Sequence, residues 1–208
     1  VETMSYRLGV DIGGTFTDFA LLDEVRGEMF IHKQLTTPDD PSRAVLEGCK
    51  HLLARKNVAI AELESIAHGT TLVTNAVIER RGARTGMVVS EGFRDVLDMA
   101  RETRYELFDL RLKFPEPLVP RQLRREVEER VKFDGSVETA LDEATVHAAI
   151  AELVDDGIEA LAICFLHSYA NPAHEIAARQ VAERAFPGLY VSTSADIFSN
   201  MREFERWT

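Results

Sequence analysis

The feature that most constrains the fold is a short glycine turn near the start of the chain. Residues 11–18 read DIGGTFTD, the apolar run YRLGVDI (6–12) leads into them, and the residues that follow alternate between apolar and polar. Phosphate loops with GxxxxGK[ST] or GxGxxG spacing open a helix, and this loop lacks both spacings. The sequence therefore predicts a tight turn between two paired strands, and an antiparallel start to a sheet.

The segments after this hairpin alternate between strand and helix patterns. Residues 39–56 have a helical apolar stripe, with Asp40 as the expected cap and Pro41 in the first turn. Residues 65–70, 71–82 and 85–90 read as strand, helix and strand, with Gly82 closing the helix and the second strand extending the sheet in parallel. The remaining expected elements are strands at 28–36, 159–166 and 188–194, and helices at 141–157 and from 171.

An interruption of this alternation is expected at residues 109–140. Prolines 115, 117 and 120 exclude a regular element, and Asp134-Gly135 is a turn signal, so we predict a peripheral loop and hairpin insertion. The Glu/Arg run at 124–130 is interpreted as the solvated edge of that hairpin. Together, the pattern predicts an α/β fold with a mixed sheet and flanking helices.

Composition excludes several classes of partner. The 208 residues have a net charge of −11 and no Lys/Arg-rich run, which argues against binding to nucleic acid or an anionic membrane. The longest apolar stretch, 160–166, is far shorter than the roughly 20 residues of a bilayer span, and no signal sequence opens the chain. Two cysteines define no disulfide framework. We expect a cytoplasmic protein.

The residue types in the turn suit a nucleotide triphosphate. Glycines allow backbone N–H groups to approach phosphate, threonine hydroxyls add donors, and a carboxylate at a strand end can hold hydrated Mg²⁺. A plain hairpin with a Gly-Gly turn remains the alternative.

A second constellation is HGTTLVTN, residues 68–75, at the start of the expected helix. Free N–H groups at a helix N-terminus favour binding of an anion. The alternative is that Thr71 only caps the helix and that His68 is a structural residue. His167 and His174 match no common zinc spacing, so we interpret them as loop and helix-start residues.

Several motifs jointly resemble one family. VDIGGTFTDFAL, TTPDDPSRAVLEG, HGTTLVTNAVIERRGARTG, EGFRDVLDMARE, PEPLVPR and FLHSYANPAHE are similar to the N-terminal region of the hydantoinase/oxoprolinase family. The resemblance covers residues 5–208 and implies the first lobe of an actin-like (ribonuclease H-like) ATPase fold. Because family members are much longer, we expect the chain to be a fragment of a longer protein.

The resemblance also implies roles, with ATP and Mg²⁺ as cofactors. Asp11 is the expected catalytic, metal-binding acid, and Asp18 is a second metal or loop-supporting acid. The expected phosphate or nucleotide contacts are Gly13, Gly14, Thr15, Thr17, Thr70, Thr71, Thr74 and Asn75, and His68 is a candidate for orienting the substrate.

Three functions remain open at this point. The resemblance implies an ATP-dependent cyclic-amide hydrolase of the hydantoinase/5-oxoprolinase type, which activates a carbonyl oxygen by phosphorylation and works with a partner subunit of the hydantoinase B type. A subunit of an ATP-dependent acetone or acetophenone carboxylase, acting on a ketone, is the first alternative. A non-catalytic actin-like nucleotide-binding module is the second.

Overall fold

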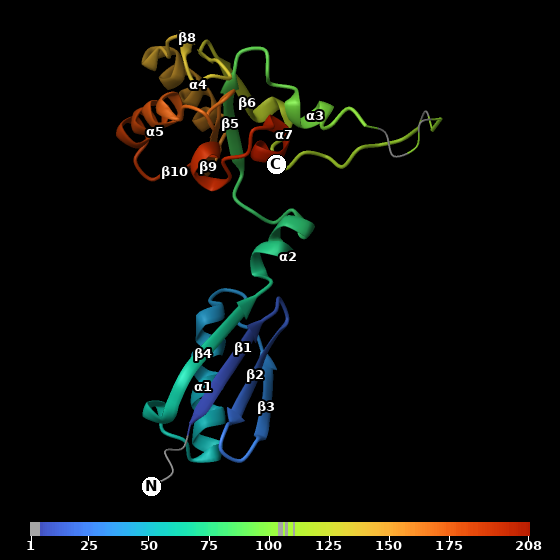
Figure 1. Ribbon diagram of the computed structural model, residues 1–208, viewed down its shortest axis with the longest axis vertical. Coiled ribbons are helices and arrows are strands. Elements are labelled where there is room, and N and C mark those ends of the chain that lie inside the picture. Colours follow the sequence, from blue (N-terminus) through green and yellow to red (C-terminus); the bar gives the residue numbers. More distant parts are fainter. Residues whose placement is uncertain (1–4, 104–105, 107, 110) are drawn as a thin grey trace. The chain divides into compact units, whose positions relative to one another are not determined.

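The chain forms two compact units, Val1–Arg81 (unit 1) and Gly82–Thr208 (unit 2) (Figure 1). The computed structural model describes residues 5–103, 106, 108–109 and 111–208. Each unit contains its own sheet and its own hydrophobic core. The two units are described separately below.

Unit 1 contains a four-stranded mixed sheet in the order β3-β2-β1-β4. The strands are β1 (Tyr6–Ile12), β2 (Phe16–Asp23), β3 (Glu28–Leu35) and β4 (Leu63–Thr70). β1 pairs antiparallel with β2, β2 pairs antiparallel with β3, and β4 lies parallel to β1. The predicted antiparallel start is therefore confirmed.

Strict alternation along β1 gives this sheet one buried face. Leu8 and Val10 are buried and pack with Phe19 of β2, whereas Arg7 and Asp11 face away from the core. Because successive residues of a strand project to opposite faces, Asp11, which lies just before the glycine turn, is on the side of the sheet opposite the core. We call that side the open face.

Helix α1 (Pro41–Lys56) covers the buried face (Figure 1). Its start is as predicted: Pro41 is in the first turn and the Asp40 side chain accepts the Ser42 N–H. Gly48 permits close packing, since a Cβ at this position would lie 2.1 Å from Cζ of Phe19. The predicted stripe missed this contact because a glycine carries no hydrophobic signal.

Helix α2 (Leu72–Glu79) follows β4 and differs from the prediction in two ways. It ends at Arg80, which adopts the left-handed conformation (φ 53°), so Gly82 does not close it. The next strand, β5 (Thr85–Ser90), pairs with strands of unit 2 and is absent from the sheet of β4. The predicted parallel extension was wrong, since strand-helix-strand order does not specify which sheet a strand joins.

Unit 2 is an open α/β unit with a parallel sheet in the order β10-β9-β5-β6. Its other strands are β6 (Arg124–Val127), β9 (Ala160–Cys164) and β10 (Tyr190–Thr193), with a small β7–β8 hairpin (Arg130–Val131 and Val137–Thr139). Its helices are α3 (Val96–Met99), α4 (Glu143–Asp155), α5 (Ala173–Ala185), α6 (Ser194–Ile197) and α7 (Glu203–Trp207).

The interrupted region of unit 2 is only partly peripheral. Residues 111–120 contain no helix or strand, and Leu110 lies outside the described residues. The hairpin occurs at β7–β8, with Gly135 at φ 82° in its turn. By contrast, β6 is a strand of the main sheet beside β5.

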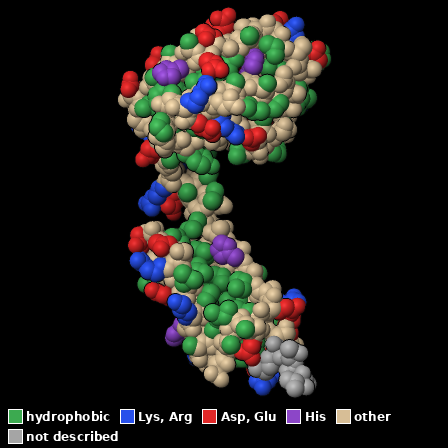
Figure 2. All heavy atoms as spheres, turned by 90° about the vertical axis from the view of Figure 1, so that its left-hand side faces the viewer, with side chains coloured by type: hydrophobic (Ala, Val, Ile, Leu, Met, Phe, Trp, Pro, Cys, Tyr) green, Lys and Arg blue, Asp and Glu red, His purple; other side chains and the backbone are tan. Residues whose placement is uncertain are grey.

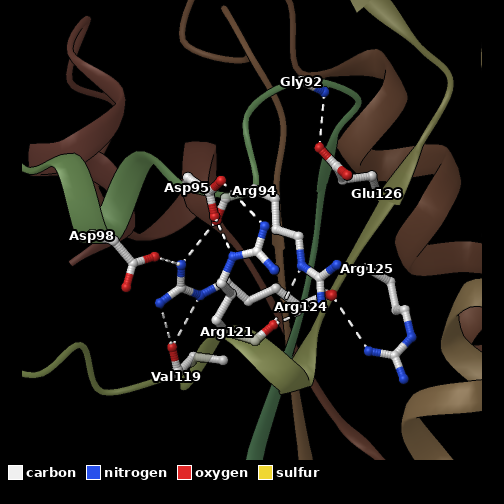
Figure 3. Close-up of polar contacts among 9 residues, drawn as sticks. All are labelled: Gly92, Arg94, Asp95, Asp98, Val119, Arg121, Arg124, Arg125 and Glu126. Carbon is white, nitrogen blue, oxygen red and sulfur yellow. Dashed lines mark hydrogen bonds and ion pairs between the residues drawn. The ribbon is translucent and has the colours of Figure 1, made fainter.

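Arg124 at the start of β6 corrects the prediction of a solvated edge for 124–130. Its side chain is fully buried and donates to the carbonyl oxygens of Val119 (3.0 and 2.9 Å) and Arg94 (2.8 Å), and it pairs with Asp98 (Figure 3). A buried guanidinium is tolerated only when its donors are satisfied, as they are here. The run of charged residues gave no sign of these acceptors, because they are mainly backbone carbonyl groups outside the run.

Glu129 is the second buried charge of the same run. Its carboxylate contacts the Ser90 hydroxyl and lies 2.7 Å from Nδ1 of His174, which is also buried. His174 therefore belongs to a buried polar cluster at the carboxyl ends of the unit 2 strands. Within the described part of the chain, no three His, Cys, Asp or Glu side chains are grouped so as to hold a metal ion.

Unit 1 exposes several large hydrophobic side chains. Figure 2 shows hydrophobic side chains gathered on one face of this unit. Exposed hydrophobic residues on its strands and helices include Ile31 of β3, Ile66 of β4, and Val73 and Ile78 of α2. Among the described helices, none is long and apolar enough to cross a membrane.

Candidate functional site

The glycine turn of unit 1 is a closed hairpin with an exposed tip. The Gly13 N–H donates to the Phe16 carbonyl at 2.9 Å, and a Cβ at Gly13 would lie 2.9 Å from that same oxygen. Gly13 is thus required by close backbone approach, and its own N–H is engaged in the turn. Gly14 and Thr15 at the tip are exposed.

A buried threonine pair supports this turn from below. Thr36, just after β3, donates its hydroxyl to the Gly13 carbonyl and its N–H to the Thr15 carbonyl, both at 2.9 Å. The Thr17 hydroxyl lies 2.9 Å from the Thr36 hydroxyl, and the Thr17 side chain is fully buried. Thr17 remains a predicted phosphate contact; in this structure its buried side chain supports the loop through Thr36.

The second constellation lies beside the turn, within the same unit. The Thr71 N–H donates to the Ile12 carbonyl at 3.1 Å, which joins the start of α2 to the end of β1. Asn75 donates from Nδ2 to the Thr71 hydroxyl at 3.3 Å, and a Cβ at Gly14 would lie 3.2 Å from Asn75 Nδ2. Thr71 occupies the cap position, but its side chain caps no backbone N–H. The structure thus brings together the two motifs that the sequence singled out.

Three other expected residues have different surroundings. The Thr70 hydroxyl is 3.4 Å from the Ile12 carbonyl and accepts the Leu72 N–H, so it ties β4 to β1 and to α2. Thr74 is exposed on α2, and no hydrogen bond of the described residues joins it to the turn. His68 is paired in register with Val10, which is on the core face, so His68 and Asp11 lie on opposite sides of the sheet.

The open face next to the turn is a shallow hollow of about 480 Å³. Asp11 and Asp18 are direct partners across β1 and β2, and Asp11 is also paired with Gly69 of β4. A Cβ at Gly69 would lie 3.6 Å from Asp11 Oδ1, so glycine leaves space beside this carboxylate. The hollow combines two carboxylates with small neighbours, among them Gly9, Ala20 and Ala67.

These residues fit a magnesium ion that arrives with a nucleotide. Mg²⁺ keeps several waters and is held in such sites by one or two carboxylates together with substrate phosphates. Asp11 is an exposed carboxylate at the end of β1, whereas both oxygens of Asp18 face Lys33, at 2.8 and 2.9 Å. The site therefore suits a metal ion whose other ligands are waters and nucleotide phosphates, and Asp11 is the carboxylate available to bind it.

Sequence reasoning missed Thr36 and Lys33. Both follow from hairpin register: pairing β2 with β3 through the turn at 24–27 puts Lys33 opposite Asp18 and leaves Thr36 just past Phe16 and Leu35. On the face of β3 that points away from the core, Lys33 is the single charged residue and lies between the exposed Ile31 and Leu35. This isolated charge was the sequence signal that could have identified Lys33.

Comparison with known proteins gives consistent matches over most of the chain. The hydantoinase/oxoprolinase N-terminal region matches residues 7–186. The chain is 36% identical over 212 residues to the alpha subunit of caprolactamase from Pseudomonas jessenii, covering 99% of this chain and 30% of that protein.

Two solved structures match with high similarity. One is the nucleotide-free structure of acetone carboxylase, from a study of ATP-dependent acetone carboxylation (TM-score 0.84, 29% identity). The other is ATP-dependent caprolactamase from P. jessenii (TM-score 0.81, 34% identity). Each comparison covers 96% of this chain and 30% of the other chain. The chain thus spans about a third of the length of these relatives.

These matches, together with the mixed sheet of unit 1, confirm the expected actin-like α/β fold. By the extent of the family match and the identity to its relatives, the chain belongs to the hydantoinase/oxoprolinase family, of which it represents the N-terminal region.

Proposed function

We propose that unit 1 supplies phosphate and Mg²⁺ contacts for an enzyme that uses ATP to activate the carbonyl oxygen of a cyclic amide. The observation that carries this proposal is the meeting of the glycine turn with the start of α2, through Thr71 and Ile12, beside the open carboxylate of Asp11. Backbone donors, small residues and one available acid are the groups that a metal-bound triphosphate requires.

Each group has a distinct task in this proposal. The exposed tip at Gly14 and Thr15 and the side chain of Asn75 would contact the phosphates, and Asp11 would hold the metal ion. Mg²⁺ supplies charge neutralisation of the phosphoryl oxygens when bound. Because phosphoryl transfer depends mainly on positioning, the protein needs to align the terminal phosphate with the carbonyl oxygen of the substrate.

A cyclic amide is the preferred substrate class because one relative, with 36% identity, is the alpha subunit of caprolactamase. The ring amide of a caprolactam is of the same chemical type as that of hydantoin and oxoproline. A ketone is the second candidate, supported by the TM-score of 0.84 with acetone carboxylase. As the caprolactamase relative is an alpha subunit, we also infer a partner subunit, of the hydantoinase B type, and a cytoplasmic location where ATP is available. A non-catalytic module remains the third reading.

The test is a substrate panel on the full-length protein with its partner subunit. Release of ADP and phosphate is followed with hydantoins, oxoproline, caprolactam, acetone and acetophenone, each with and without bicarbonate. Turnover that depends on a cyclic amide alone supports the hydrolase, and turnover that needs a ketone and bicarbonate supports the carboxylase. Nucleotide binding without turnover on any substrate supports the non-catalytic module.

The residue-level test is Asp11→Asn, which keeps the shape of the side chain and removes its charge. We expect substrate-dependent ATP turnover to fall by about a hundredfold or more, because metal stabilisation is worth several kcal/mol. The control is Asp39→Asn, an exposed acid paired with Arg43 at 2.9 Å outside the hollow, which should retain activity. Unchanged turnover of Asp11→Asn at saturating Mg²⁺ would contradict the metal role.

A further inference from the structure

Three charged residues form one row across the open face of unit 1. Strand register pairs Asp11 with Asp18, and Asp18 with Lys33. Residues directly opposite one another in antiparallel strands project from the same face, with Cβ atoms about 4.5–5.5 Å apart. Two carboxylates are therefore neighbours in this row, and an ammonium group follows the second.

The ammonium group of Lys33 contacts both carboxylate oxygens of Asp18. Its Nζ lies 2.8 Å from Oδ1 and 2.9 Å from Oδ2 of Asp18, and 5.0 Å from the centre of the Phe16 ring. The ring and the carboxylate thus hold the ammonium from two sides. Since both charged side chains are about half exposed, this ion pair contributes little to folding stability. Its main effect is to reduce the negative charge of the hollow and to occupy the oxygens of Asp18.

Asp11 has the opposite environment. Within the described part of the chain, no Lys, Arg or His forms an ion pair with Asp11. Its neighbour on the other side of the row is Gly69, which leaves space next to Oδ1. The row therefore contains one engaged carboxylate and one open carboxylate.

We propose that Lys33 is a specificity-determining residue that restricts this site to nucleotide-bound metal. By occupying both oxygens of Asp18, Lys33 leaves Asp11 as the one available carboxylate among the described residues that line this hollow. A single exposed carboxylate is a weak ligand for free Mg²⁺ or Mn²⁺, whereas two adjacent carboxylates chelate such ions. The metal then binds well only when phosphate oxygens supply its other ligands. This inference rests on the proposed function.

The experiment measures Mn²⁺ binding to the full-length protein without nucleotide, by electron paramagnetic resonance of free Mn²⁺. Lys33→Met removes the ammonium group and keeps the length of the side chain. We expect Lys33→Met to bind Mn²⁺ at least about tenfold more tightly than the wild type, because it gains a second carboxylate and loses a repulsive charge. Lys33→Arg keeps the charge and should match the wild type.

A double variant identifies the ligand that is released. Lys33→Met combined with Asp18→Asn should return Mn²⁺ affinity to the wild-type value, since the freed carboxylate is gone. An unchanged Mn²⁺ isotherm for Lys33→Met would overturn the proposal. So would a loss of Mn-ATP affinity in Lys33→Met with no gain for Mn²⁺ alone, because Lys33 would then be a phosphate contact.

The same titrations separate this inference from the proposed function. If the wild type binds Mn-ATP and Lys33→Met gains no Mn²⁺ site, the role of Lys33 is wrong and the nucleotide site stands. If Lys33→Met gains the Mn²⁺ site but neither protein binds Mn-ATP, the proposed function is wrong and the engagement of Asp18 by Lys33 is upheld.

Discussion

The hydroxyl of Thr36 donates to the Gly13 carbonyl at 2.9 Å from beneath the glycine turn. The same hydroxyl lies 2.9 Å from that of Thr17, so one side chain joins β2, the turn and the end of β3. The turn is therefore held in shape by a residue outside the DIGGTFTD motif. This relationship makes Thr36 a means of testing whether turn geometry matters for nucleotide binding.

Thr36→Val should weaken nucleotide binding and stability together. The substitution preserves volume but leaves the Gly13 carbonyl and the buried Thr17 hydroxyl without this partner, which costs about 1–3 kcal/mol. Titration calorimetry of the full-length protein with Mg-ATP and denaturant unfolding measure the two effects. Thr36→Ser keeps the hydroxyl and should behave much like the wild type. Equal affinity in Thr36→Val would mean that the turn does not position the nucleotide.

The sequence predicted the outline of unit 1 well because its signals were local. Alternation along β1, the Asp40 cap and the glycine turn each involve residues close together in the chain. The two motifs lie beside each other for a related reason: the turn and the start of α2 are each local, and their proximity follows once β4 lies parallel to β1.

The failures have a common physical cause in non-local contacts. The buried environment of Arg124 depends on carbonyl groups of Val119 and Arg94, which lie outside the run 124–130. The pairing of β5 with β9 instead of β4 depends on which sheet buries its apolar side chains. None of these partners can be read from the letters of one segment.

Gly48→Ala should destabilise unit 1 despite the better helix propensity of alanine. The new methyl group would lie 2.1 Å from the Phe19 ring, and overpacking of this kind costs about 1–3 kcal/mol, against a propensity gain of about 1 kcal/mol. Hydrogen exchange of amides in α1 and β2 of the 208-residue chain measures the change. Gly82→Ala, where a Cβ would contact nothing within 4 Å, is the control. Phe19→Leu in the Gly48→Ala background should recover part of the loss.

Arg124→Met should destabilise unit 2 by about 2–4 kcal/mol. The new side chain fills similar space, but the Val119 and Arg94 carbonyls lose their charged donor. Trp207 is the single tryptophan of the 208-residue chain and is buried in unit 2, so its fluorescence follows urea unfolding. The matched control is Arg121→Met, an exposed arginine 2.6 Å from Asp95, which should cost less than about 1 kcal/mol (Figure 3). Similar losses for both variants would contradict the importance of burial.

His167 should make the stability of unit 2 depend on pH. Burial lowers the pKa of this imidazole from its ordinary value, and its Nδ1 is buried without a hydrogen-bond partner among the described residues. Because the folded pKa lies below the unfolded value of about 6.5, the unfolded chain binds more protons as the solution is acidified. The contribution is therefore fully present above pH of about 6.5 and is lost as pH falls through the folded pKa.

The substitution that isolates this effect is His167→Asn. His167 has a left-handed backbone (φ 54°), which asparagine tolerates, so the exchange removes the titrating group without adding strain. We expect the free energy of unfolding, followed by Trp207 fluorescence, to fall less between pH 7.5 and 5.5 in His167→Asn than in the wild type. His167→Gly should show the same reduced pH dependence, because neither residue titrates in this range. If both variants keep the wild-type dependence, the protonation that destabilises unit 2 occurs elsewhere, and the buried Nδ1 of His167 has no part in it.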